Sequence, residues 1–501
     1  MKSPLLAYTI QAGHKRGEQM EQTPTEIEKK IEHIEAELGS SSDLTIRRLE
    51  IGVHRLKIAV IWIKGMVEVK ALNESVLSPL LLHTKLLALM PNQPNGLELI
   101  CGNFVTAFET VYAEMDRTVP LLLSGYTLIV ADGFEQCAAI DTQGYLIRGI
   151  EEPSSTVVVR GPRDGFIECF EVNVTLIRRR LQNRKIRVET MVVGEISQTS
   201  VSMMYLEDRA SKEVVDEVRQ RLQNIDIDAV LESQYIEELI RDNKGSIFPT
   251  VYSTERPDDA ASGIVEGRVA IIVDGTPFVL LVPCTFFHLM KTAEDNYRAY
   301  PIATFIRWIR FTGLLITLLF PSLYVAILMF HPELVPPQLL SSVLSAREGV
   351  PFPLILEAVI MEMTFEGLRE AGVRMPRAIG SAISIVGALV IGESAVNAGI
   401  ISSPTIIVVA GTAIASFVIP SIELSGAIRL LRFFMLIWAS LLGLYGIIFG
   451  LILLAIHLTT LESVGTPYLY PITPFNKREA MKTFFRMPWW SLNEHTKGRR
   501  R

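Results

Sequence analysis

The run FTGLLITLLFPSLYVAILMF at residues 311–330 carries no charge and is long enough to cross the hydrocarbon core of a bilayer. Arg307 and Arg310 stand immediately before it, where a cytoplasmic flank is typically basic. Most of the acidic residues and lysines precede residue 300, whereas the long apolar runs all follow it. The sequence therefore predicts a charged N-terminal part joined to a membrane domain.

The membrane domain is expected over residues 301–460 and to be α-helical and polytopic. Its predicted segments are 311–330, about 352–368, 379–400, 402–422 and 433–457. Small residues are frequent between 380 and 415, which favours closely packed helices over a lone anchor. The number of crossings stays open, because five would place the basic tail at 461–501 outside, whereas a re-entrant or sixth segment would keep it in the cytoplasm.

The N-terminal part is predicted to contain two α+β lobes, at residues 44–181 and 182–300, because short β-rich runs alternate there with amphipathic stretches. Asp274 and Gly275 predict a tight hairpin within GRVAIIVDGTPFVLLVPC. Residues 1–43 are expected to be a flexible segment with one amphipathic helix. Its isoleucine stripe is interpreted as a docking surface rather than as part of a core.

Several functional classes receive no support from the sequence. The phosphate-binding glycine loops, HExxH, paired CxxC and GxSxG motifs are absent, and the 8 histidines are scattered. We therefore expect no enzyme, no cofactor and no metal site. The net charge of −6 and the lack of interleaved basic and aromatic residues argue against nucleic-acid binding.

The N-terminal part is expected to lie in the cytoplasm. The 4 cysteines lack the dense spacing of a disulfide scaffold, which favours a reducing compartment. The first residues are too poor in apolar side chains to form a signal peptide.

The run LILEAVIMEMTFEGLRE at 354–370 sets glutamates into an apolar helix. Glu362 and Glu366 lie about 40° apart on a helical wheel, close to Arg369, whereas Glu357 points elsewhere. A carboxylate in hydrocarbon requires protonation, an arginine partner or a wet cavity. We interpret the run as part of an ion or water pathway; the alternative is that Glu366 lies at the cytoplasmic interface. The candidate intramembrane polar residues are Glu357, Glu362, Thr364, Glu366, Glu393 and Asn397.

A second set of candidates lies in the soluble part. VVVRGPRDGFIE at 157–168 offers arginines suited to carboxylate pairing, and LIRRRLQNRKIR continues the basic character. The candidate subunit-interface residues are Arg160, Arg163, Asp164, Arg178, Arg179 and Arg180. Contact with anionic lipid, a solvated turn and a solvated linker remain alternatives.

Several of these stretches carry a family resemblance. RGPRDGFIE, NVTLIRRRL, EDNYRAYPIATFIRWIRF, the segment 351–404 and GTPYLYPITPF are similar to the A subunit of the GerA-type spore germinant receptors of endospore-forming bacteria. The resemblance is collinear from about residue 44 to 487, and 351–404 is its most specific part. MEMTFEGLREAGVRMPRAIG resembles the receptor form more than the related family member that accompanies the spore dipicolinate channel.

The resemblance implies a protein of the spore inner membrane with its N-terminal region on the core side. It further implies a transporter-like B subunit, thought to bind the nutrient, and a lipoprotein C subunit as partners. A subunits of this kind are proposed to oligomerise into a nutrient-gated cation channel. Alternatives are the dipicolinate-associated family member and a membrane-anchored scaffold or sensor whose soluble lobes bind a small ligand.

Overall fold

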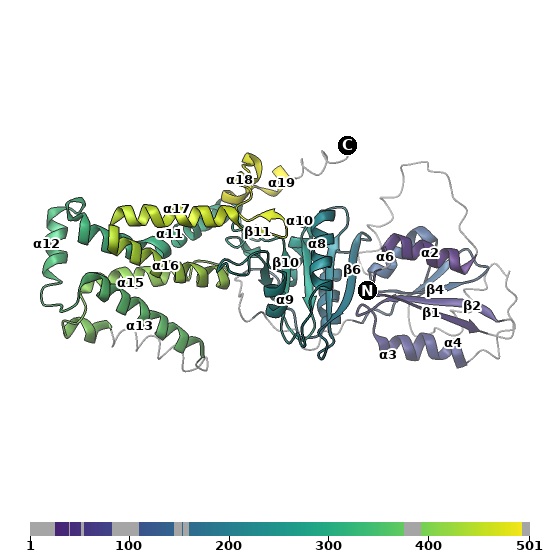
Figure 1. Ribbon diagram of the computed structural model, residues 1–501. Coiled ribbons are helices and arrows are strands. Elements are labelled where there is room, and N and C mark those ends of the chain that lie inside the picture. Colours follow the sequence, from purple (N-terminus) through teal and green to yellow (C-terminus); the bar gives the residue numbers. More distant parts are fainter. Residues whose placement is uncertain are drawn as a thin grey trace. The chain divides into compact units, whose positions relative to one another are not determined.

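The computed structural model describes residues 26–39, 41–51, 55–82, 110–144, 153, 160–374 and 392–492 (Figure 1). The chain forms two compact units, Met1–Arg148 with Leu181–Val188, and Gly149–Arg180 with Glu189–Arg501. Gly149–Arg180 thus groups with the second unit, although the sequence places it in the first lobe at residues 44–181.

The first unit contains a five-stranded sheet of order β1-β2-β4-β5-β3, in which each strand pairs antiparallel with its neighbours. The strands are β1 (Leu44–Ile51), β2 (Leu56–Ile63), β3 (Thr110–Ala113), β4 (Thr127–Ala131) and β5 (Cys137–Ile140). Both faces are covered. One packs against α3 (Val69–Leu72), a π turn (Asn73–Leu77) and α4 (Ser78–Leu82), and the other against α2 (Ile27–Leu38) and α6 (Met115–Leu123) (Figure 1). Alternate residues of β2 and β4 therefore enter separate cores.

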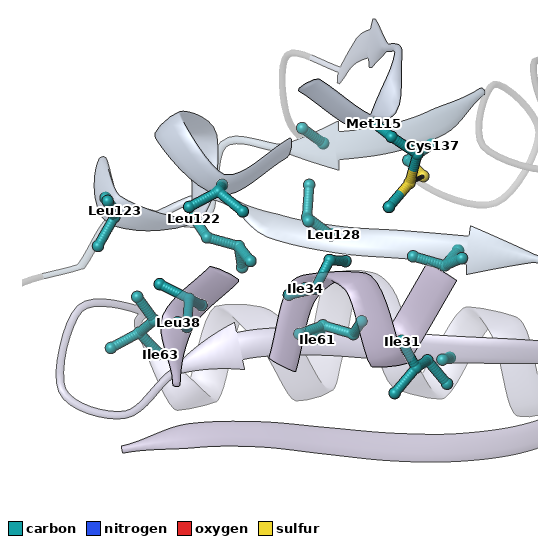
Figure 2. Packing of buried hydrophobic residues seen from close by; sticks show 14 of the residues in the cluster. Ile31, Ile34, Leu38, Ile61, Ile63, Met115, Leu122, Leu123, Leu128 and Cys137 are labelled. Carbon is teal, nitrogen blue, oxygen red and sulfur yellow. Dashed lines mark hydrogen bonds between the residues drawn. The ribbon is translucent and has the colours of Figure 1, made fainter. Parts of the chain in front are cut away.

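Helix α2 is part of the second of these cores. Figure 2 shows Ile34 among Ile61, Leu122 and Leu128, and its side chain is fully buried. The sequence correctly locates the helix and its stripe, but the interpretation as a docking helix outside the core is wrong. The physical reason is that one face of the sheet would remain uncovered without α2, because α6 alone is short.

The second unit begins with an α+β lobe whose sheet order is β6-β7-β9-β10-β8. Its strands are β6 (Ile186–Val193), β7 (Thr199–Leu206), β8 (Tyr252–Thr254), β9 (Val269–Val273) and β10 (Val279–Val282). Its helices are α7 (Phe170–Arg180), α8 (Lys212–Gln223), α9 (Ser233–Ile240) and α10 (Pro257–Glu266). The predicted hairpin is confirmed, since β9 pairs with β10 and Gly275 has a φ of +85°.

The two lobes repeat one topology. In each, the first strand pairs with the second, the second with the fourth, the fourth with the fifth and the fifth with the third. A helix precedes the first strand, helical segments follow the second strand, and one helix separates the third from the fourth in both lobes. The repeat concerns the order of elements, which local sequence patterns do not reveal.

The helical region follows the second lobe. It comprises α11 (Tyr300–Phe330), α12 (Pro337–Ser345), α13 (Leu354–Arg374), α15 (Ser403–Ser416), α16 (Ile422–Leu442) and α17 (Leu444–Thr460). Among the described residues, α11 and α16 are long and apolar enough to cross a membrane, and α15 and α17 are shorter apolar helices. Most of the predicted segment at 379–400 lies outside the described residues.

The predicted segment at 433–457 is wrong in its boundaries. The segment belongs to two helices, α16 and α17, which are separated at Gly443. The φ of +61° at Gly443 ends α16. Because α16 begins at Ile422, it includes Arg429 and Arg432. The predicted segments 402–422 and 433–457 leave both arginines in the connection between them.

The C-terminal segment packs against the N-terminal end of α11. It contains a short hairpin of β11 (Glu462–Ser463) and β12 (Thr466–Pro467), then α18 (Lys477–Phe484) and α19 (Trp489–Leu492). Arg307 of α11 donates hydrogen bonds to the carbonyls of Lys482 and Thr483. The described part of this segment is therefore structured rather than a free tail.

Candidate functional site

The most unusual feature of the helical region is a group of buried charges between α13 and α16. Arg432 Nη2 lies 2.8 Å from Glu362 Oε2 and 3.0 Å from Glu366 Oε1. Arg429 Nη1 donates to Glu366 Oε2 at 2.5 Å. The side chains of Glu362 and Arg432 are each only 1% exposed. We call Glu362, Glu366, Arg429 and Arg432 the charge cluster.

The charge cluster is paired but not fully hydrogen-bonded. Neither Glu362 oxygen has a well-directed hydrogen bond to the described part of the chain, and Arg432 Nε and Nη1 also lack partners there. The contact between Glu362 and Arg432 is therefore an ion pair without the hydrogen bonds that normally accompany burial. Such a pair is weak evidence for stability, because desolvation offsets much of its attraction. This incomplete satisfaction is more typical of a functional site.

Glu357 belongs to a separate polar contact. Its Oε1 accepts hydrogen bonds from the backbone N–H of Ser402, at 2.7 Å, and from the Ser402 hydroxyl. Ser402 precedes the first turn of α15, where the helix dipole favours a carboxylate. Arg347 Nε is 3.5 Å from Oε2, a distance that gives electrostatic attraction rather than a strong hydrogen bond. Glu357 thus joins the start of α13 to the start of α15.

The remaining predicted intramembrane residues do not join the charge cluster. Thr364 donates to the carbonyl of Ile360 within its own helix. Glu393 and Asn397 are exposed. Arg369, which the helical wheel places near Glu362 and Glu366, lies over the Phe417 ring, with its guanidinium carbon 5.5 Å from the ring centroid.

Arg429 and Arg432 are the functional candidates that the sequence analysis missed. They stand three residues apart in IRLLRFF, and Glu362 and Glu366 stand four apart. Both spacings place the two side chains on one helical face. The complementary spacing was therefore a usable signal, but it does not reveal which helices are neighbours.

The predicted subunit-interface residues differ in their surroundings. Arg180 Nη2 donates to both carboxylate oxygens of Asp164 at 2.6 Å, so this pair is formed within one chain. Arg178 is buried, which is inconsistent with a residue that presents a surface. Arg160, Arg163 and Arg179 are exposed.

A second group of acids lies where the lobe of the second unit meets α16. Ser253 donates to Glu423 Oε1 at 2.8 Å, and Arg241 forms an ion pair with Glu237. Burial, with the nearby Glu423 carboxylate as the second cause, raises the pKa of Glu237 to about 7. The contact between this lobe and α16 therefore contains a carboxyl group, that of Glu237, whose protonation changes near neutral pH.

This raised pKa predicts a pH-dependent stability. The folded state holds the proton of Glu237 more tightly than the unfolded chain, so stability is greatest below about pH 4.5 and declines as the pH rises through about 7. Glu237→Gln should remove about 2–3 kcal/mol of this decline, measured as the unfolding temperature between pH 5 and 8. Glu238→Gln, at a neighbouring exposed position, is the control. An unchanged pH profile in Glu237→Gln would contradict the assignment.

The described residues contain no group of three or more histidine, cysteine, aspartate or glutamate side chains that could hold a metal ion. The acids of the charge cluster instead form ion pairs with arginines of the same chain.

Comparison with known proteins decides the family. A family model described as "Bacillus/Clostridium GerA spore germination protein" matches residues 32–497, which is most of the chain. The chain belongs to the GerA spore germination protein family.

Two Bacillus subtilis proteins are similar to this GerA-family chain over most of its length. Spore germination protein KA of Bacillus subtilis (strain 168) is 44% identical over 93% of this chain and 85% of that protein. The uncharacterized membrane protein YfkQ of the same strain is 40% identical over 93% of this chain and 90% of that protein. The crystal structure of the N-terminal domain of the A subunit of the Bacillus megaterium spore germinant receptor GerK3 matches at 34% identity and a TM-score of 0.43, covering 54% of this chain and 99% of that one.

Proposed function

We propose that this GerA-family protein is the A-type membrane subunit of a spore germinant receptor and oligomerises into a nutrient-gated cation channel. Membership of the family and the name of its relative KA support a role in germination. The apolar helices α11 and α16, and the description of YfkQ as a membrane protein, support a membrane location.

The observation that carries the channel proposal is the charge cluster. Buried charges within apolar helices are unfavourable and are typical of ion pathways and gates. In the structure Arg432 and Arg429 neutralise the acidic face of α13. Movement of α13 away from α16 would uncover the carboxylates of Glu362 and Glu366, and an acidic lining favours cations. We assign the structure to the closed state of this gate.

In the closed state, the ion pathway interpreted from the run at 354–370 is not open. Glu357 and Glu362 are fully buried against other helices of the same chain, so neither faces a free surface here. Glu362 therefore acts as a gating group that becomes part of the lining on opening. Glu357 holds α13 to α15 in both states through Ser402.

The receptor would be assembled in the spore inner membrane with a transporter-like B subunit and a lipoprotein C subunit. A nutrient bound by a partner would shift the equilibrium between closed and open states only through its preference for the open one. The basic residues Arg307 and Arg310 at the foot of α11 favour a cytoplasmic location for the N-terminal lobes.

The proposal is tested by potassium efflux from spores that carry Glu362→Gln. The substitution keeps the size of the side chain but removes its charge, so we expect nutrient-triggered efflux to slow several-fold at an unchanged protein level. Glu370→Gln is the matched control, since Glu370 pairs with Arg374 on the exposed surface of the same helix. Normal efflux in Glu362→Gln would remove this residue from the gate.

A further inference from the structure

A polar cavity of about 600 Å³ lies in the second unit, away from the charge cluster. Its walls come from α10, the loop after β10, the short 3-10 helix Ala293–Asn296, the foot of α11 and α18. This volume is within the range of small-molecule binding sites. The cavity therefore joins the lobe, a long apolar helix and the C-terminal segment.

Some of the basic groups lining the cavity are already paired. Arg307 donates to Asp295, Lys482 pairs with Glu479 at 2.7 Å, and Arg486 donates to backbone carbonyls. These groups contribute positive potential but have little hydrogen-bonding capacity left for a ligand.

Three further lining side chains retain unused donors. Lys291 is half-buried; its ammonium group forms no hydrogen bond within the described part of the chain, although the charges of Glu266 and Glu479 attract it. Arg268 Nη1 is buried without a partner among the described residues, although Nη2 contacts Glu266 at 3.2 Å. Neither ring nitrogen of His288 has a hydrogen-bond partner there. Buried polar atoms such as Arg268 Nη1 and the His288 ring nitrogens normally have a partner.

The described acidic residues of the cavity wall form no hydrogen bonds with the unused N–H groups of Lys291, Arg268 and His288. Asp259 accepts a hydrogen bond from Tyr252 at 2.6 Å. Glu266 pairs with the other nitrogen of Arg268, and Glu479 pairs with Lys482. The capacity that remains in the cavity is therefore mainly that of cationic and N–H donors.

We propose that this cavity binds an anionic group, a phosphate or a carboxylate, through Lys291 and Arg268, with His288 as a further donor. Arginine and lysine are the usual partners of such anions, the former by its planar fork and the latter as a point charge. Burial lowers the pKa of His288, and the charges of Arg268 and Lys291 lower it further. A bound anion offsets these charges.

The surroundings of the cavity indicate two sources for the anion. Trp308, Trp489 and Trp490 are exposed near the foot of α11, and tryptophan is enriched at the level of lipid headgroups. A phospholipid headgroup could therefore supply the phosphate. A small soluble anion could also enter from the aqueous side.

The test uses the purified full-length protein in a neutral detergent free of phosphate. We expect inorganic phosphate to raise the unfolding temperature of the wild type in a saturable manner, as a ligand of the folded state does. Lys291→Gln should weaken this binding about tenfold or more, because it removes a charge-assisted contact. Lys244→Gln, which removes an exposed charge from the same lobe, should bind as the wild type does.

A second arm uses nanodiscs of phosphatidylcholine with or without phosphatidylglycerol. Stabilisation by phosphatidylglycerol alone assigns the site to a lipid headgroup, and stabilisation by phosphate alone assigns it to a soluble anion. Arg268→Gln serves as the second variant if Lys291→Gln does not fold. Equal binding by wild type and both variants, or binding of neither probe, would overturn the proposal. The measurement involves no ion flux, so its result is independent of the channel proposal.

Discussion

Arg432→Met is expected to lower the free energy of unfolding by about 3–5 kcal/mol. The substitution keeps the apolar stem but removes the guanidinium group that contacts both Glu362 and Glu366. Glu362 is then left as a buried carboxyl without a cation, which is far less favourable than the intact pair. The measurement is equilibrium unfolding of the purified protein in mixed micelles.

The design includes a control and a rescue. Arg374→Gln breaks an exposed pair on the same α13 helix, with side chains 79% and 65% exposed, and should change stability by less than about 0.5 kcal/mol. Adding Glu362→Gln to Arg432→Met should recover part of the loss, because the unpaired acid is neutralised. If the changes in the free energy of unfolding caused by Arg432→Met and Glu362→Gln simply add in the double variant, Arg432 and Glu362 do not interact.

Asp295→Asn is the second substitution with a large expected effect. Asp295 is 1% exposed and contacts Arg307 at 2.9 Å and Arg310 at 2.9 Å, which lie in the first turns of α11. Its loss leaves two buried arginines without a carboxylate, so we expect about 3–5 kcal/mol of destabilisation.

The effect of Asp295→Asn should be concentrated where the lobe meets α11. Limited proteolysis of the variant should therefore cut between the lobe and α11 before it cuts the sheets. Asp226→Asn, at an exposed position of the same lobe, is the control. Wild-type stability in Asp295→Asn would contradict the structural role assigned to this acid.

Local patterns predicted the elements better than their partners. The β-rich run GRVAIIVDGTPFVLLVPC located β9 and β10, and its Asp274 and Gly275 pair located the hairpin between them. The isoleucine stripe of α2 was also visible, but the sheet face that it covers depends on strand order, which no local window contains. Gly443 divided a continuous apolar run because its backbone conformation, rather than hydrophobicity, ends α16.

The sequence predicted the acidic residues of the candidate site but not their arginine partners. Wheel geometry grouped Glu362 with Glu366 and separated Glu357, and in the structure the first two contact Arg432 whereas the third contacts Ser402. The cationic partners Arg429 and Arg432 fall between two predicted segments, because arginines usually mark the boundary of a membrane segment. Their pairing with α13 is a tertiary contact between residues more than sixty positions apart.

We propose that the protein conducts cations when a nutrient acts on the assembled receptor. The most direct test is potassium flux across liposomes that contain the wild-type protein with its B and C subunits, with and without candidate nutrients. The account predicts a flux that requires the nutrient and is reduced several-fold by Glu362→Gln but not by Glu370→Gln. Nutrient binding by the complex with no flux above that of protein-free liposomes would contradict the channel and favour a membrane-anchored sensor.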